Sequence, residues 1–142
     1  MKKRVLFVCS WNSCRSQMAE GFGRTLAGED FEVKSAGINA GGVNADAIAA
    51  MREIGVDISA QTSDRLTAAH YAWADYIVTV CDAARDNCPI VPAGAKSVHW
   101  SVRDPYGDHL DEATKESSFR EVRNELRDRI VSLFERIRQG EI

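Results

Sequence analysis

The sequence predicts an α/β fold: a single doubly wound domain, in which a four-stranded parallel sheet carries helices on both faces. Short apolar runs alternate with segments whose apolar residues recur every three or four positions, and no linker or repeat interrupts them. The chain has 142 residues, of which 44% are hydrophobic, and this suits one domain spanning 1–142. In such sheets ligands bind at the carboxyl ends of the strands, so functional residues are expected there.

The first half of the chain is expected to form two strands and two helices. Lys3 to Val8 is an apolar run typical of a buried strand, and Phe31 to Ser35 is a second strand. Ser16 to Ala27 has the spacing of a helix. A further helix is capped by Asn44 and ended by Gly55. The apolar face of this second helix is predicted to contain Ile48, Met51 and Ile54.

The second half of the chain continues the alternation. A short helix over Thr67 to Trp73 leads into a third strand, Asp75 to Val80. The polar segment Cys81 to Asn87 is expected to be a brief helix or a loop. Lys96 to Trp100 is the fourth strand, and a long amphipathic helix runs from about Ala113 to Arg138.

The turn between the first strand and the first helix has a distinctive composition, because Cys9 is followed six places later by Arg15. Backbone N–H groups, the start of the helix and the guanidinium would together surround a tetrahedral oxyanion. The same positive field favours the thiolate of Cys9, which would then be a nucleophile facing its electrophile. The alternative is a buried cysteine that ends a strand, with a surface arginine nearby. The strand before the turn and the helix after it favour the oxyanion site over this alternative. The residues expected to bind substrate are Ser10, Trp11, Asn12, Ser13, Cys14, Arg15 and Ser16.

Other reactive side chains follow the third and fourth strands. Asp104 comes just after the fourth strand and is expected to act as a general acid or base, although it could also be a turn former. Cys81 and Cys88 follow the third strand and enclose a polar segment. We therefore expect their thiols to be exposed and to exchange disulfides with Cys9, whereas the alternative is that they are simply buried.

Charge and spacing argue against several classes of protein. The net charge is −3 with no basic stripe, so no nucleic-acid partner is expected. No apolar run is long enough for a signal peptide core or a membrane span, so we expect a cytoplasmic protein without a membrane partner. The spacings Cys9-x4-Cys14 and Cys81-x6-Cys88 do not match a structural zinc site.

Two groups of motifs resemble a known family over nearly the whole chain. Cys9-x5-Arg15-Ser16 with a downstream Asp104-Pro105 is similar to the low-molecular-weight protein tyrosine phosphatases. Cys81-x6-Cys88-Pro89, followed by His99-Trp100, resembles more specifically the thioredoxin-coupled arsenate reductases built on that fold. By this resemblance the substrate is arsenate, the partner is thioredoxin, and no organic cofactor is needed.

The resemblance also implies a role for each site residue. Cys9 is the nucleophile, Arg15 and the loop amides hold the oxyanion, Ser16 helps to stabilise the thiolate, and Asp104 is the acid and base. After Cys9 has attacked arsenic, Cys81 attacks the Cys9 sulfur and expels arsenite. Cys88 then attacks Cys81 and leaves a disulfide for thioredoxin to reduce.

Further positions match the family or depart from it. Five residues match positions that bind potassium in some members, namely Asn12, Glu20, Ser35, Thr62 and Asp64. Cys14 matches a cysteine usually regarded as structural, while Trp11 stands where the family commonly has glycine. Tyr106 resembles the rim aromatic of the phosphatases, so a phosphotyrosine phosphatase is an alternative function. A non-catalytic oxyanion or redox sensor is another.

The spacing of the last two cysteines has a geometric consequence. If Cys81 to Cys88 is helical, its seven residue steps separate the end Cα atoms by roughly 10–11 Å. A disulfide needs Cα atoms about 4.4–6.8 Å apart. The segment must therefore unwind for the disulfide to form, and oxidised and reduced proteins are predicted to differ mainly over about residues 80–98.

Overall fold

The computed structural model describes residues 2–87, 91–106 and 111–142. Four parallel strands form one sheet in the order β2-β1-β3-β4. Their bounds are β1 Lys3–Cys9, β2 Phe31–Gly37, β3 Tyr76–Thr79 and β4 Lys96–His99. The predicted four-stranded parallel sheet is confirmed, with strand ends that differ from the prediction by one or two residues.

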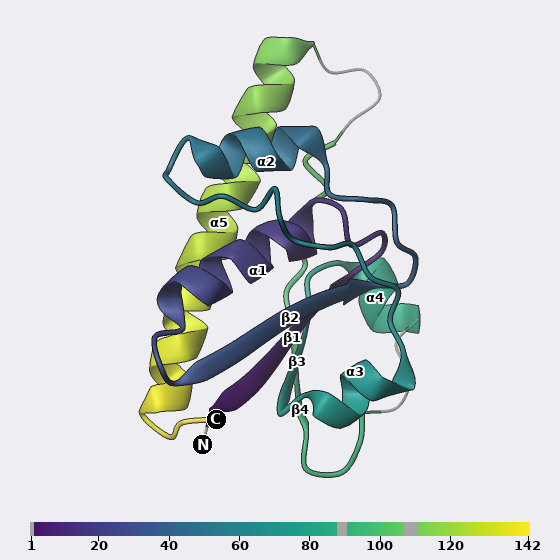
Figure 1. Ribbon diagram of the computed structural model, residues 1–142, viewed down its shortest axis with the longest axis vertical. Helices are drawn as coiled ribbons and strands as arrows, with labels where there is room; N and C mark the ends of the chain where they lie inside the picture. Colours follow the sequence, from purple (N-terminus) through teal and green to yellow (C-terminus); the bar gives the residue numbers. More distant parts are fainter. Residues whose placement is uncertain (1, 88–90, 107–110) are drawn as a thin grey trace.

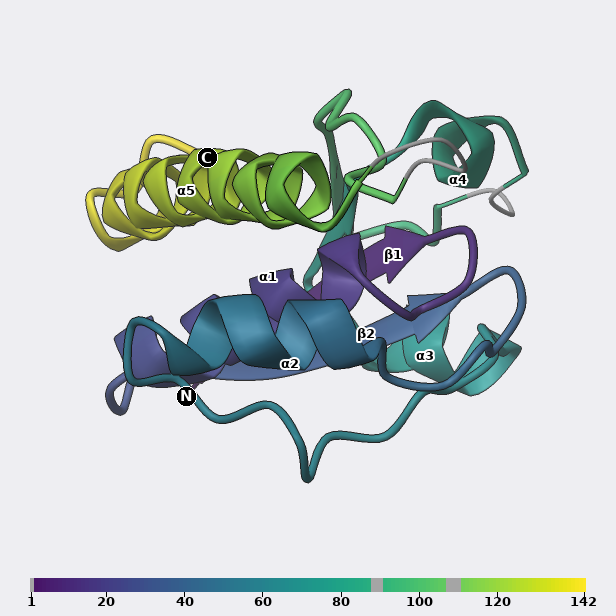
Figure 2. The ribbon, with the colours of Figure 1, turned by 90° about the horizontal axis from the view of Figure 1, so that it is seen from above.

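Helices cover both faces of this sheet, as predicted. The helices are α1 Arg15–Leu26, α2 Ala45–Arg52, α3 Ala68–Trp73, α4 Asp82–Asn87 and α5 Glu112–Arg138. On one side lie α1, α2 and α5, and on the other lie α3 and α4 (Figure 1). Seen from above, α5 runs alongside the pair formed by α1 and α2 (Figure 2). Within the described residues, every helix is too short or too polar to span a membrane.

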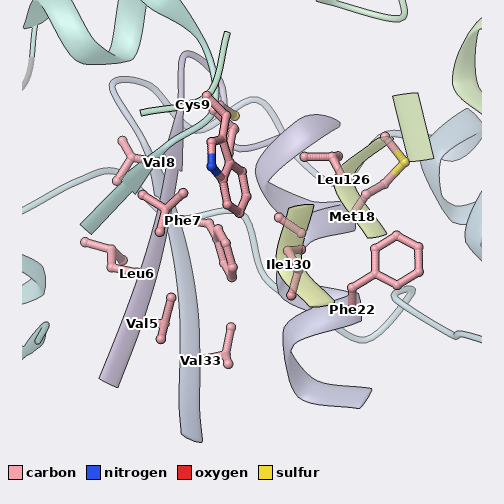
Figure 3. Close-up of a cluster of buried hydrophobic side chains, with 14 of the residues drawn as sticks. Val5, Leu6, Phe7, Val8, Cys9, Met18, Phe22, Val33, Leu126 and Ile130 are labelled. Carbon is pink, nitrogen blue, oxygen red and sulfur yellow. The ribbon is translucent and has the colours of Figure 1, made fainter. Parts of the chain in front are cut away.

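The hydrophobic core is centred on β1, which has a neighbouring strand on each side. All four side chains from Val5 to Val8 are fully buried. Phe7 points from β1 toward Ile130 of α5, whereas Leu6 points to the other side of the strand (Figure 3). Burial of such side chains is the main stabilising contribution to a domain of this size. It holds the end of β1, where Cys9 lies, in a fixed position.

The second helix is shorter than predicted. It ends at Arg52, and Ile54 lies beyond it with 37% of its surface exposed. The chain leaves the helix in a turn in which Ile54 N donates to Met51 O at 3.1 Å, and Gly55 adopts a φ of 80°. Met51 is buried as predicted, but the assignment of Ile54 to the apolar face was wrong because the helix stops before reaching it.

The carboxyl ends of β1 and β3 lie side by side. Beyond the strand ladder, Val80 N donates to Val8 O at 2.9 Å and so extends the pairing to the residue before Cys81. The strand order reverses at this point, because β2 follows β1 on one side and β3 pairs with it on the other. In open α/β sheets this crevice is where ligands bind. Cys9 and Cys81 both lie at it.

Candidate active site

The loop after β1 is held open by the segment that follows β2. The loop carbonyls of Cys9, Ser10 and Trp11 accept hydrogen bonds from the backbone N–H groups of residues 38, 39 and 41, at 3.1, 2.8 and 2.8 Å. The C=O and N–H of one peptide point in opposite directions. Because these carbonyls turn outward, the adjoining N–H groups point into the loop, as an oxyanion site requires.

Close approach of two backbones gives this loop its shape. A Cβ atom on Gly37, the last residue of β2, would lie 2.6 Å from Asn12 N and 2.4 Å from Asn39 O. Glycine is therefore required at this position. Asn12 itself has a φ of 48°, a left-handed conformation that asparagine tolerates better than most residues. The fit between β2 and the loop thus depends on glycine at position 37 and is favoured by asparagine at position 12.

A short hydrogen-bond chain reaches the sulfur of Cys9. Cys9 Sγ lies 2.8 Å from Ser16 Oγ, and the Asn12 side-chain N–H donates to the same Ser16 oxygen at 2.7 Å. Since that oxygen accepts from Asn12, the hydroxyl hydrogen of Ser16 is free to be donated to the sulfur. All three residues are buried. This arrangement stabilises negative charge on Cys9.

The predicted acid and the predicted anion-binding arginine line one cavity together with Cys9. The cavity has a volume of about 340 Å³, and Arg15 and Asp104 form part of its wall. Arg15 is oriented by Nη1, which donates to Val102 O at 2.9 Å. Trp11 and Tyr106 lie at its mouth with 58% and 52% of their surfaces exposed.

The second cysteine of the loop is in a different electrostatic environment. Cys14 also lines the cavity, but burial raises the pKa of its thiol to about 12, and the nearby negative charges of Asp104 and Cys9 act in the same direction. A thiol with so high a pKa is protonated at neutral pH and is a poor nucleophile. The surroundings of Cys14 therefore do not favour a nucleophilic role for its thiol.

The prediction of an exposed thiol at Cys81 was wrong. Cys81 is only 4% exposed, and its Sγ lies 3.3 Å from Ser10 Oγ and accepts a hydrogen bond from Ala84 N at 3.3 Å. The segment after it is polar, but it forms α4 and turns Ala84 inward over the end of β3 while its charged residues face out. Cys88 lies outside the described residues.

A polar network that the sequence did not reveal ties α4 to the sheet. Asp82, the first residue of α4, accepts from Ser101 Oγ at 2.6 Å and lies 2.9 Å from His99 Nε2. The other ring nitrogen, His99 Nδ1, is 2.7 Å from the hydroxyl of Thr79, which is buried in β3. The hydrogen bonds from Ser101 and His99 lower the pKa of the Asp82 carboxyl. His99 therefore links α4 to β3, and its place in the His99-Trp100 motif was the one signal in the sequence for such a role.

The five residues predicted to hold potassium form two connected groups. The first joins Asn12, Ser35 and Glu20: Asn12 Nδ2 donates to Ser35 Oγ at 2.9 Å, and Ser35 donates to Glu20 at 2.6 Å. In the second, the Thr62 hydroxyl donates to Asp64 at 2.8 Å. The groups meet where Asp64 N donates to the Asn12 side-chain oxygen at 2.7 Å.

These potassium-site candidates supply the oxygen atoms that a hard cation prefers. One of them already has a charged partner, because Arg24 Nη2 lies 2.7 Å from the second carboxylate oxygen of Glu20. A potassium ion would therefore share or displace this ion pair. The five residues are suitable in chemistry, and potassium binding stays a prediction.

Comparison with known proteins identifies related sequences along the whole chain. The family model described as low molecular weight phosphotyrosine protein phosphatase matches residues 4–141. A protein of Oceanobacillus iheyensis named arsenate reductase is 46% identical over 129 residues, covering 91% of this chain and 93% of that protein.

Solved structures give the same result. An arsenate reductase in a phosphate-binding state superimposes with a TM-score of 0.76 at 35% identity, covering 95% of this chain and 98% of the other. A thioredoxin-dependent arsenate reductase of Corynebacterium glutamicum has a TM-score of 0.78 at 28% identity. That match covers 98% of this chain and 63% of the longer Corynebacterium protein.

Proposed function

The chain belongs to the low molecular weight phosphotyrosine protein phosphatase family, and we propose that within this family it is an arsenate reductase that depends on thioredoxin. Its relatives over most of the chain carry the name arsenate reductase, and one neighbour of known structure is thioredoxin-dependent. The observation that carries the proposal is the position of Cys81. Its sulfur contacts Ser10, the residue directly after Cys9, at the paired ends of β1 and β3.

The first chemical step uses the residues that line the cavity. Arsenate binds to the loop N–H groups and to the Arg15 guanidinium, which holds two of its oxygens. The Cys9 thiolate, hydrogen-bonded by Ser16, attacks arsenic and forms a sulfur–arsenic bond. Asp104 gives a proton to the departing oxygen, which leaves as water. The product of this step is a Cys9-bound arsenate.

The second step transfers two electrons to arsenic. Cys81 attacks the Cys9 sulfur, a sulfur–sulfur bond forms, and the pair of electrons from the sulfur–arsenic bond stays with arsenic, which leaves as arsenite. Cys88 then attacks Cys81 and releases the Cys9 thiolate. The resulting disulfide between Cys81 and Cys88 is reduced by thioredoxin, so the thiols of the chain carry all the electrons. A cytoplasmic location, where thiols stay reduced, suits this chemistry.

The same cavity supports a weak side reaction. Hydrolysis of an aryl phosphate needs only Cys9, Arg15 and Asp104. In this reaction water releases the phosphate bound to Cys9, whereas with arsenate Cys81 attacks the Cys9 sulfur. Tyr106 lies at the mouth of the cavity, where the ring of such a substrate would extend. We therefore expect slow phosphatase activity that is independent of thioredoxin.

The test is turnover with thioredoxin as the sole reductant. Wild-type protein should release arsenite repeatedly, whereas Cys81→Ser and Cys88→Ser should lose that turnover and keep slow aryl-phosphate hydrolysis. Retained hydrolysis shows that the loop is intact in both variants. Arsenate reduction at the wild-type rate by both variants would contradict this relay, in which electrons pass through the thiols of Cys9, Cys81 and Cys88. Repeated aryl-phosphate turnover without any release of arsenite would favour the phosphatase function.

A further inference from the structure

The two ends of α4 are attached to the protein in different ways. The first residue, Asp82, is bound by Ser101 and by His99, and His99 is held in turn by Thr79 of β3. In the last turn, by contrast, the side-chain hydrogen bonds of the described residues stay within α4. Arg85 Nε donates to Asp86 at 3.1 Å, and the Asn87 amide donates to Ala83 O at 2.7 Å.

This difference matters because the relay makes opposite demands on the two cysteines. Cys81 must stay beside Cys9 while it attacks the sulfur of the arsenate adduct. Cys88 must then approach Cys81 to within the Cα separation of about 4.4–6.8 Å that a disulfide allows. If α4 unwound from its first turn, Cys81 would move away from Ser10 and lose its contact with the loop. Unwinding from the last turn has no such cost.

We propose that Asp82, His99 and Ser101 are positioning residues of the relay, which fix the first turn of α4 so that it unwinds only from the end nearer Cys88. This inference rests on the proposed reductase function. The three side chains join the start of α4 to residues at the carboxyl end of β4, and through Thr79 to β3. Cys81 lies between Thr79 and Asp82 in the chain, so an anchor on both of its sides fixes the position of its sulfur.

The experiment isolates the step at which Cys81 acts. In a Cys88→Ser background, one turnover forms the disulfide between Cys9 and Cys81 and releases one arsenite, and both products are measured by quenched flow with peptide mass mapping. Adding Asp82→Ala should slow this step by roughly tenfold, the effect of losing a charge-assisted hydrogen bond. Asp82→Asn, which keeps an oxygen acceptor for Ser101, should recover part of the rate.

A second aspartate in the same helix provides the matched control. Asp86 has 64% of its side chain exposed, against 60% for Asp82, but it pairs with Arg85 of α4 instead of with the sheet. Asp86→Ala should therefore leave the rate of the single turnover unchanged. Ser101→Ala is a milder second variant, and it should slow the same step by about threefold because one of two hydrogen bonds remains.

The outcomes separate this inference from the proposed function. If the Cys88→Ser parent releases no arsenite, the reductase proposal fails first. If the parent reacts and Asp82→Ala matches it, or if Asp86→Ala slows the step equally, the anchor is disproved. Aryl-phosphate hydrolysis is measured on every variant, because this reaction bypasses Cys81. A parallel loss of hydrolysis would show that the network supports the whole site instead of the relay, and would also overturn the proposal.

Discussion

The anion loop and α4 each follow a parallel strand, and a cysteine directly precedes each of them, but the protein holds them very differently. The loop after Cys9 is hydrogen-bonded along its length to segments that are distant in the sequence, and Asn12 within it and Ser16 at the start of α1 are fully buried. The helix α4 is fixed mainly at Asp82. The loop that binds the oxyanion is therefore rigid, whereas the helix between the two relay cysteines has one end that is free to move.

A second set of side chains explains the rigidity of the loop. Gln17 donates from one amide group to Asn12 O at 3.0 Å and to Thr62 O at 2.9 Å, and Ser63 donates to Asn12 O at 2.8 Å. Gln61 in turn donates to the side-chain oxygen of Gln17 at 2.8 Å. These bonds fix the loop before substrate arrives, so little reorganisation is needed during the reaction.

The largest effect is expected from the loss of the nucleophilic sulfur in the rigid loop. Cys9→Ser should abolish both arsenate reduction and aryl-phosphate hydrolysis, because a serine hydroxyl is not ionised in a field that stabilises a thiolate. The measurement is arsenite release and aryl-phosphate turnover, with circular dichroism to confirm the fold. Cys14→Ser is the matched control in the same loop, and it should keep measurable activity. Appreciable arsenite from Cys9→Ser would contradict the assignment of the nucleophile.

The second largest effect is expected at Asp104, and it tests whether this residue is the general acid. Asp104→Asn should lower both activities by roughly 10²–10⁴-fold, the range for loss of a general acid. The carboxyl also accepts a hydrogen bond from Tyr106 N at 2.9 Å, which asparagine can still accept, so the turn should be preserved. Steady-state kinetics on both substrates measure the change. A nearly normal rate would show that Asp104 only forms a turn and is not the general acid.

Hydrogen exchange compares the two regions directly. We expect amides in the last turn of α4, at about residues 85–87, to lose protection when the disulfide forms, because a short helix with few outside contacts unwinds at low cost. Amides of the loop and of α5 should keep theirs. Mass spectrometry of oxidised and reduced protein provides both the exchange and the disulfide state. Equal protection of α4 in the two states, with the disulfide verified, would show that no unwinding is required.

The smallest effect concerns a cation behind the loop. If potassium binds among the oxygens of Asn12, Ser35 and Glu20, it should raise the melting temperature by about 2–4 °C relative to sodium at equal ionic strength. The gain is modest because Arg24 already pairs with Glu20. Arg24→Ala removes this competition, so its response to potassium should be larger. Identical melting temperatures in the two salts, for both proteins, would speak against the ion.

The sequence predicted the features that depend on local pattern and on topology. Strand ends are marked by apolar runs that stop, so the expectation that Cys9 and Cys81 lie at the same edge of the sheet agrees with the structure. Burial of Cys81 was missed, because the composition of a polar segment does not reveal which face of a helix turns inward. The contact between Asp82 and His99 joins residues 17 positions apart, and no periodicity signals such a pair.

The pairing of β1 with β3 has a consequence for how this activity could arise. Neighbouring strands lie about 4.8 Å apart, and here the pairing continues to Val8 and Val80, one residue before each cysteine. Any hydrolase with this sheet already presents the second residue after its third strand, the position of Cys81 here, to its nucleophile. Conversion from hydrolysis to reduction then needs sulfur at that point and a second thiol on a segment able to reach it. The sheet already places the two positions close together. A change from hydrolysis to reduction, by evolution or by engineering, therefore needs new side chains and not a new fold.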